Sequence, residues 1–522
     1  MKTLRKAILP FVVIALFAFL AACGGQSSSN GGSSSDAKSG QSASTRTDKS
    51  KLVIGLDADP PQLDPAMSTA AVDRQVYQSI YNTLVDIDKN LNYVPELATS
   101  WKISDDGKTY TFNLRKNVLF QDGTPFNAEA VKFNFERMLD PKLGSPRLSE
   151  INLIDKITVV DDYTIRIHLK QPYAPFLSVL SDRAGMMVSP TAVKKEGKDF
   201  ANHPVGTGPY KFVKHVKQGD LVVERFDKYW GNKPKIKTIV YKPFPDGTTR
   251  LTNLISGDVD IVNTIDYKDI KRANSAANLK VSSTESLGFQ GIQLNTKVKP
   301  FDNKKVRQAV NIALDRNAIA KVVFFNGVVP ATSPFPETSW AHPSDLQVPK
   351  ADVAKAKQLL KESGLSNVSF TLKISPSPQE KQLAQMIQSM LQQVGFKVKI
   401  EMVEFGTLLE QTAEGDYQAA RVGWSGRTDP DGNAYAWFTT NGTLNYMKYS
   451  NPEVDKLLQE ARTSLDQEKR KALYDRVSKI LWDDAPYIFL YYPKDYKAMK
   501  NDVEGFVHVP DIMIRTENLQ FK

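Results

Sequence analysis

The segment from residue 368 to residue 402 constrains the fold most, because its apolar pattern changes period twice. Apolar side chains alternate with polar ones over Val368–Ile374, recur at helical spacing over Leu383–Val394, and alternate again over Phe396–Met402. A period of two is typical of a strand, and spacings of three and four are typical of a helix. Gly395 gives the helix a C-terminal stop. The sequence therefore predicts a strand–helix–strand unit with a right-handed crossover and parallel strands.

Strand and helix patterns mix along the rest of the chain. Lys51–Leu56 is a short apolar strand, and Lys108–Arg115 and Tyr163–Leu169 alternate as half-buried strands do. Two helical stripes are predicted to be core, and they are formed by Val306, Ala309, Val310, Ala313 and Leu314, and by Leu473, Val477, Ile480 and Leu481. The roughly 470 residues after Ser50 suffice for two or three cores. We expect an α/β protein without a repeat of fixed period.

The N-terminus has the form of a bacterial lipoprotein signal. Lys2, Arg5 and Lys6 precede the apolar run Ala7–Ala22, and Leu20–Cys23 resembles a lipobox. The alternative, a membrane-spanning anchor, needs about 20 apolar residues, and this run is shorter. We therefore predict a signal peptide over residues 1–22 and fatty acyl chains on Cys23. Cys23 is the only cysteine, so no disulfide is expected.

Residues 23–50 are predicted to be a lipidated cysteine followed by a flexible Gly/Ser linker, because almost no apolar side chain occurs there. Acyl chains would hold the folded part on the outer face of the cytoplasmic membrane, or in a periplasm. The sequence leaves the type of envelope open. The formal charge is +10, and it falls to +7 when the three basic residues of the signal are removed. Because basic and acidic residues alternate, no nucleic-acid partner is predicted.

The sequence offers no recognisable catalytic site. The five histidines, at positions 168, 203, 215, 342 and 508, lack metal-ligand spacing, so no metal and no cofactor are predicted. No Gly-x-Ser-x-Gly elbow and no phosphate loop occur. Gly206–Pro209 resembles half a phosphate loop, but Pro209 lacks the backbone donor, so a tight turn is favoured. We expect that the protein is not an enzyme.

Short motifs in a fixed order carry a family resemblance. They are Leu63–Pro65, Pro95–Trp101, Asp105–Arg115, Phe120–Pro125, Gly206–Tyr210, Ser256–Ile261, Val306–Val310, Asp315–Arg316 and Gly423–Trp424. The chain resembles the family 5 extracellular solute-binding proteins, which include the peptide-binding and nickel-binding receptors of ATP-driven importers. The resemblance implies a two-lobed, periplasmic-binding-protein type II-like fold with an inserted subdomain and a ligand in the cleft between the lobes.

The same resemblance divides the folded part into interleaved segments. The first lobe is expected to take residues 51–85, 198–285 and 488–522, and the inserted subdomain residues 86–197. The second lobe is expected to take residues 286–487, which contain the strand–helix–strand unit.

The resemblance also assigns candidate ligand-binding residues. In peptide-binding relatives the ligand pairs its backbone with two extended segments. By motif these correspond to Thr69–Ala71 (Thr69, Ala70 and Ala71) and to Gly423–Ser425 (Gly423, Trp424 and Ser425). Trp424 and Phe405 would then form the walls of side-chain pockets, although plain core packing is an equal alternative for Phe405.

One position departs from the family pattern. Many peptide binders have an Asp three residues after the tryptophan, where it meets the ligand's α-ammonium group, and this chain has Arg427 there. Either Arg427 points away, or the ligand presents an anion. Asp429 is a candidate replacement partner for the amine. Arg421 matches a position at which oligopeptide binders capture the ligand carboxylate, a task that suits a planar guanidinium group.

The resemblance therefore implies a lipid-anchored, monomeric receptor that delivers short peptides or peptide-like solutes to an ABC permease and its ATPase. Within the same fold, the alternative solutes are a nickel chelate, an opine or an oligosaccharide. A remote alternative is an anchored hydrolase or adhesin. The cognate permease and the length of the ligand stay open at this stage.

Overall fold

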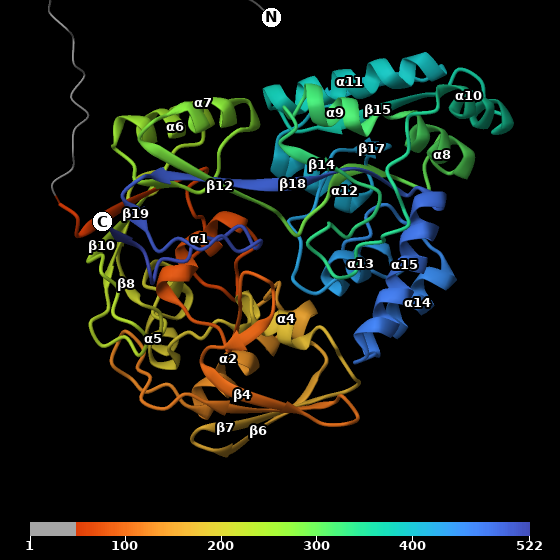
Figure 1. Cartoon of the computed structure of the whole chain (residues 1–522). Helices are drawn as coiled ribbons and strands as arrows, with labels where there is room; N and C mark the ends of the chain where they lie inside the picture. The colour runs from red at the N-terminus through yellow and green to blue at the C-terminus, as the bar shows by residue number, and fades with distance from the viewer. Residues whose placement is uncertain (1–47) are drawn as a thin grey trace, which may run out of the picture. The chain divides into compact units, whose positions relative to one another are not determined.

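The structure, a computed structural model, describes residues 48–522. The predicted signal peptide, Cys23 and the predicted linker up to residue 47 lie outside the described residues. No helix within residues 48–522 is long and apolar enough to cross a bilayer. The described part contains a central sheet of twelve strands, a separate sheet of four strands and two short hairpins (Figure 1).

The first lobe is one half of the central sheet with the helices that cover it. Its strands are β1 (Lys51–Leu56), β8 (Tyr210–His215), β9 (Leu221–Arg225), β10 (Thr238–Pro243), β11 (Ile261–Val262) and β12 (Leu279–Glu285). Its helices are α1 (Ala71–Ile80), α6 (Gly247–Ser256), η3 (Tyr267–Asp269) and α7 (Ile270–Ser275). The predicted strand β1 is confirmed, and it pairs in parallel with β10 and β11. The residues that follow these three strands therefore gather at one edge of the sheet.

The second lobe is the other half of the central sheet. Its strands are β13 (Gln290–Leu294), β14 (Val328–Pro330), β15 (Ser369–Ile374), β16 (Lys397–Met402) and β17 (Ala419–Ala420). Its helices are α8 (Lys304–Ala313), α9 (Arg316–Val322), α10 (Val353–Glu362), α11 (Pro378–Val394), α12 (Phe405–Glu414), α13 (Asp431–Phe438), α14 (Pro452–Thr463) and α15 (Gln467–Asp484).

The predicted strand–helix–strand unit is confirmed as β15, α11 and β16. The two strands are parallel neighbours, with Ser369 opposite Lys397. Ser377 caps the start of α11 by accepting a hydrogen bond from the backbone of Glu380, and Gly395 ends the helix in the left-handed conformation.

One long strand, β18 (Tyr487–Lys500), belongs to both lobes. Its first residues pair with β13, and its residues from Lys494 onward pair with β12. The chain therefore passes between the lobes twice at the same place, once in the connection 286–289 and once inside β18 (Figure 1). The predicted boundary at residue 488 falls inside this strand.

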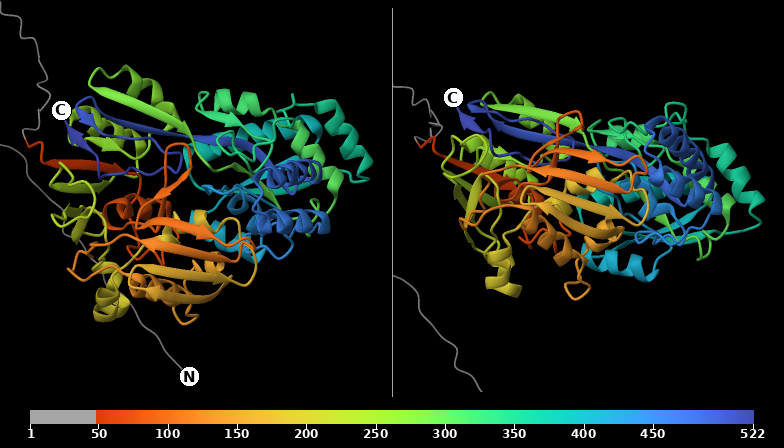
Figure 2. Two further views of the ribbon diagram at one scale, coloured as in Figure 1. Left: turned by 60° about the horizontal axis from the view of Figure 1, so that its bottom comes forward. Right: turned by 90° about the horizontal axis from the view of Figure 1, so that it is seen from below.

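A separate antiparallel sheet is inserted after α1, and we call it the inserted sheet. Its strands, in spatial order, are β4 (Ala98–Ile103), β5 (Thr109–Leu114), β7 (Thr164–Leu169) and β6 (Ile154–Asp161). β5 and β7 confirm the two strands predicted from alternation. Three helices accompany the sheet, α2 (Ala128–Leu139), α3 (Leu148–Ile151) and α4 (Phe176–Leu180). Both views of Figure 2 show the inserted sheet as a layer of its own.

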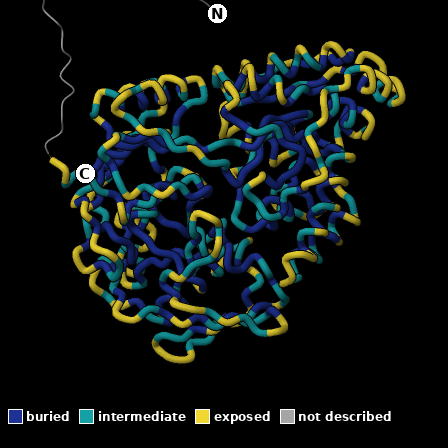
Figure 3. Tube along the Cα trace, viewed as in Figure 1, coloured by how far each residue is buried: buried dark blue, intermediate teal, exposed yellow. Residues whose placement is uncertain are grey.

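The remaining elements are short. They are β2 (Val85–Ile87), β3 (Tyr93–Pro95), η1 (Arg183–Gly185), α5 (Pro190–Glu196), η2 (Gly197–Asn202), β19 (Val503–Glu504) and β20 (Gln520–Phe521). Core residues lie along the strands, which appear as buried trace in Figure 3, with exposed turns outside. The predicted helical stripe on α8 is buried, and so is the stripe on α15 except for Ile480, which is half-buried.

The second lobe touches the segment around α4. The backbone N–H of Asp429 donates to Ser178 Oγ at 3.1 Å, and the backbone N–H of Ala174 donates to the carbonyl of Arg462 at 3.0 Å. The two sides of the cleft are thus in contact in this structure.

Candidate functional site

The loop after β17 carries Trp424 and Arg427. The backbone N–H of Trp424 donates to the carbonyl of Phe289 at 2.9 Å, and the N–H of Phe289 donates back at 3.1 Å. The loop therefore pairs like a short strand with the connection between the lobes. The guanidinium carbon of Arg427 lies 4.5 Å from the Trp424 ring centroid, which is a favourable cation–π distance.

The predicted segment Thr69–Ala71 leads into α1. Thr69 and Ala71 are exposed, whereas the preceding Ser68 is buried and donates from its hydroxyl group to Asp73 at 2.8 Å. Asp73 also accepts a hydrogen bond from the backbone of Gln62 at 3.2 Å. Asp73 therefore holds the segment against the first turn of α1.

Asp73 makes stability depend on pH. Burial raises its pKa to about 6, although hydrogen bonds from Ser68 and Gln62 and the charge of Arg183 oppose the rise. Because the folded pKa lies above the unfolded one, the native state binds the proton more tightly, and stability falls as pH rises through this window. From pH 4.5 to pH 6.5 we expect Asp73 to remove about 2 kcal/mol of unfolding free energy.

Urea denaturation of the wild type and of Asp73→Asn at several pH values measures this dependence. The difference in unfolding free energy between the two proteins should change by about 2 kcal/mol from pH 4.5 to pH 6.5. A gap that stays constant from pH 4.5 to pH 6.5 would show that Asp73 does not titrate there.

A cavity of about 260 Å³ lies between the lobes beside the hinge strand β18. The first lobe contributes the residues that follow its parallel strands, and the second lobe contributes the loop after β17. Its lining includes Asp57, Ala71, Gln75, Asn263, Gln290, Trp424, Ser425, Asp495 and Lys497. The structure thus brings Ala71 of the first predicted segment together with Trp424 and Ser425 of the second.

Some polar groups of the cavity have several hydrogen-bond partners within the protein, and others have few. Asp495 accepts two hydrogen bonds from Lys497 and one from His508 at 2.9 Å. Asp57 lies on the surface and accepts one bond from Asn263 at 2.7 Å. The indole N–H of Trp424 is buried and has no hydrogen-bond partner in the part of the chain that the structure describes. A solute could therefore supply partners to Trp424 and Asp57 without breaking a buried ion pair.

A cluster of charges lies next to the segment Thr69–Ala71. Arg183 Nη1 is 3.4 Å from the Ser68 hydroxyl and 3.5 Å from the Ala70 carbonyl. Asp182, beside it, lies 3.0 Å from Arg74 Nε and 3.9 Å from Arg427 Nε. The cluster joins α1, the segment before η1 and the second lobe.

This geometry of two lobes, a hinge strand and a polar cleft agrees with comparisons to known proteins. Residues 92–446 match the family described as bacterial extracellular solute-binding proteins, family 5. The chain belongs to this family. It is the solute-binding component of an ABC importer and works outside the cytoplasm.

Relatives of this family 5 protein match it over nearly the whole length. The glutathione-binding protein GsiB of Pectobacterium atrosepticum is 34% identical over 491 residues, covering 89% of this chain and 93% of the relative. The binding protein DppA of Helicobacter pylori, solved with the peptide STSA, has 30% identity and a TM-score of 0.82, covering 90% and 98% of the two chains. The oligopeptide-binding protein AppA of Bacillus subtilis, solved with a nonapeptide, has 28% identity and a TM-score of 0.80, covering 90% and 99%.

Of the ten candidate ligand residues in this family 5 protein, three line the cavity, namely Ala71, Trp424 and Ser425, and seven do not, namely Thr69, Ala70, Phe405, Arg421, Gly423, Arg427 and Asp429. Phe405 begins α12 with its side chain 52% exposed, and it does not line the cavity. Arg421 is buried and forms a two-pronged ion pair with Glu380, both contacts being 3.1 Å. Both oxygens of Asp429 accept hydrogen bonds from Arg470.

The predicted ligand roles of Arg421 and Asp429 would therefore require breaking a buried ion pair. Their partners, Glu380 and Arg470, lie 41 residues away in the sequence in each case, so the motifs gave no sign of them. Gly423, by contrast, sits where an added Cβ would overlap the Gln290 side chain that lines the cavity.

Several cleft residues were missed by sequence reasoning. Asp57 and Asn263 directly follow parallel strands, which is a position that could have marked them. Asp495 and Lys497 are charged residues two apart in an apolar strand, so they share one face and could have been noticed. Asp182 and Arg183 carry no motif and gave no signal.

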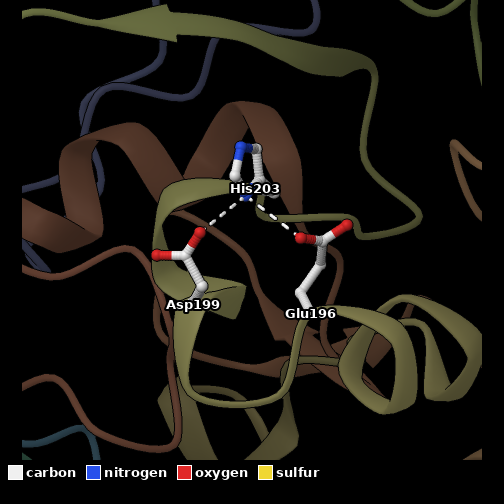
Figure 4. Close-up of side chains that lie close together, drawn as sticks. All are labelled: Glu196, Asp199 and His203. Atoms are coloured by element: carbon white, nitrogen blue, oxygen red, sulfur yellow. Dashed lines mark ion pairs between the residues drawn. The ribbon is translucent and has the colours of Figure 1, made fainter.

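One side-chain group within residues 48–522 has the spacing of a metal site. Glu196, Asp199 and His203 lie at the end of α5 and in η2, and His203 Nδ1 is 3.2 Å from Glu196 and 3.3 Å from Asp199 (Figure 4). Two of the three are exposed, and Lys195 pairs with Glu196 at 2.8 Å. Such exposed ion pairs are common on protein surfaces, so the group carries no functional assignment.

Proposed function

We propose that this protein is a lipid-anchored receptor that captures a short peptide or a peptide-like solute in the interlobe cavity and presents it to a membrane permease. Acyl chains on Cys23 hold it at the outer face of the membrane. It acts as a monomer and performs no chemistry on its cargo. The peptide class is supported by the relatives named for peptides and glutathione.

The observation that carries the proposal is that Trp424 lines a cavity shared by both lobes and has a buried indole N–H without a hydrogen-bond partner among residues 48–522. A buried donor without a partner costs about 1–3 kcal/mol, so a ligand carbonyl that reaches it would recover this energy. This hydrogen bond forms only when the solute is enclosed between the lobes. Trp424 therefore favours a solute bound inside the cleft over one bound on the surface.

Asp57 is the acid that we assign to a ligand ammonium group in place of Asp429. It follows β1 and lines the cavity, and its charge acts on the buried Arg250, which also has Asp266 at 3.6 Å. Breaking the pair of Asp429 with Arg470 would leave a buried charge uncompensated, whereas engaging Asp57 would not.

Replacing Trp424 with Phe tests the proposal, because phenylalanine keeps an aromatic ring and removes the N–H. We expect the dissociation constants for reduced glutathione and for tri-alanine, measured by calorimetry, to rise about 5–20-fold for each probe that binds. Failure of both probes to bind the wild type would contradict the peptide class.

Trp437→Phe is the matched control. The Trp437 indole N–H is also buried and unpartnered within the described residues, but the residue belongs to a hydrophobic core of the second lobe and does not line the cavity. Because its ring packs against that of Trp424, with the centroids 5.7 Å apart, its replacement reports the effect of disturbed packing and should raise the dissociation constants less than Trp424→Phe does. Equal effects of the two substitutions would argue that Trp424 acts through packing alone.

A further inference from the structure

Four arginines converge on one carboxylate where the lobes meet. Arg74 comes from α1, Arg147 precedes α3, Arg183 begins η1 and Arg427 comes from the second lobe. Burial would raise the pKa of Asp182, but all four arginines together hold it well below its usual range. We call these five residues the arginine cluster.

The arginine cluster carries excess positive charge. Its four guanidinium groups face Asp182 and Glu150, which pairs with Arg147, and this leaves two positive charges uncompensated. Asp73, which accepts a hydrogen bond from Ser68, also interacts with the charge of Arg183. If Asp73 is counted as well, one positive charge remains uncompensated. Like charges repel strongly at low dielectric, so the mutual repulsion of the four guanidinium groups destabilises this arrangement.

Donors in the cluster are also unused. The side chains of Arg147 and Arg183 are 7% and 5% exposed, and the Nε group of each has no hydrogen-bond partner among residues 48–522. Buried guanidinium donors are normally satisfied, so two such Nε groups around one carboxylate favour an acceptor supplied by a ligand. A carboxylate provides acceptors that match a guanidinium fork.

The arginine cluster differs in charge balance from three other buried arginines, although Arg470 also has a buried Nε without a hydrogen-bond partner among the described residues. Arg421 is balanced by Glu380, Arg462 by Asp431 at 2.7 Å, and Arg470 by Asp429 at 2.5 Å. These three arginines thus each have a carboxylate of their own, whereas the four arginines of the cluster share Asp182 and Glu150.

Arg427 is the cluster member that the second lobe contributes. It lies 3.9 Å from Asp182 and close enough to Arg74 and Arg183 for their charges to oppose its own. Burial together with these arginines lowers the pKa of Arg427 to about 10, while Asp182 opposes the change. An anion placed between the lobes would offset this repulsion.

We propose that the arginine cluster is a subsite for a carboxylate of the solute, and that occupying it favours closure of the lobes. The inference rests on the proposed function and narrows it to acidic peptides or peptide-like acids. Either a C-terminal or a side-chain carboxylate has the required chemistry.

Three matched probes, measured by calorimetry on the whole folded protein, show whether a C-terminal or a side-chain carboxylate occupies the subsite. Ala-Ala-Ala carries a terminal carboxylate, Ala-Glu-Ala amide carries only a side-chain carboxylate, and Ala-Gln-Ala amide carries none. At least one acid should bind about 30-fold more tightly than the neutral amide, which corresponds to about 2 kcal/mol. Arg427→Met should remove this preference.

Arg462→Met is the control, because Arg462 crosses the same interface and stacks on Tyr435 and Tyr173, yet its charge is balanced by Asp431. Arg462→Met should lower the affinity for both acids and for the neutral amide by the same factor. Equal binding of acids and amide to the wild type would overturn the carboxylate subsite and leave the peptide receptor intact. Binding of none of the three would overturn the proposed function itself.

The unliganded variants give a second readout that needs no ligand. Because Arg427→Met removes a repelling charge, its melting temperature should equal or exceed that of the wild type. Arg462→Met should melt earlier, because it leaves Asp431 buried without its partner. A clear drop in the melting temperature of unliganded Arg427→Met would contradict the charge excess.

Discussion

Replacing Asp429 with asparagine is expected to lower the unfolding free energy by about 3–5 kcal/mol, because the change leaves Arg470 as a buried charge without its partner. The two side chains are 6% and 7% exposed and are joined by contacts of 2.5 and 2.9 Å. Urea denaturation at neutral pH measures the loss.

The matched control for Asp429→Asn is Glu224→Gln. Glu224 pairs with Lys211 at 2.8 Å, but both side chains are nearly half exposed, so the loss should stay below about 1 kcal/mol. Similar small losses in both variants would mean that Asp429 is free to bind a ligand. N-acetylated peptides should raise the melting temperature less than free peptides do, because acetylation removes the ammonium group that we assign to Asp57.

The second large effect is expected from Gly426→Ala. Gly426 has φ = +84°, and a Cβ there would lie 2.2 Å from the backbone of Leu287 in the connection between the lobes. The backbone must move to remove the overlap, which displaces the loop that carries Trp424 and Arg427. We expect a stability loss of about 3–4 kcal/mol and a loss of peptide affinity of at least about 100-fold.

Gly364→Ala separates the backbone strain from the overlap. Gly364 has φ = +74°, close to that of Gly426, but nothing lies within 4 Å of an added Cβ. This control should cost only about 1–2 kcal/mol and leave peptide affinity unchanged. If Gly426→Ala behaved like Gly364→Ala in both assays, the pairing between the loop and the hinge would not position the site.

The sequence predicted the elements whose pattern is local. The period of two in β5 and β7, and the two changes of period across β15, α11 and β16, follow from which face of each element is buried. The motif Gly423–Trp424 pointed to the loop after β17, of which Trp424 and Ser425 line the cavity.

Long-range partners could not be predicted from one sequence. Whether Arg421 or Asp429 was free depended on Glu380 and Arg470, which approach only when the chain folds. The same holds for Asp182, whose three closest arginines come from α1, η1 and the second lobe. Arg427 stood out in the sequence by its departure from the family pattern, but its surroundings, and hence the charge excess, needed the structure.

The most direct test of the central claim is a crystal structure of the purified protein with its bound solute. We predict a small, peptide-like molecule enclosed between the lobes, with an acceptor at the Trp424 indole and an anionic group beside Arg427. A solute bound on the outside of either lobe, with an empty cleft at Trp424, would contradict the account.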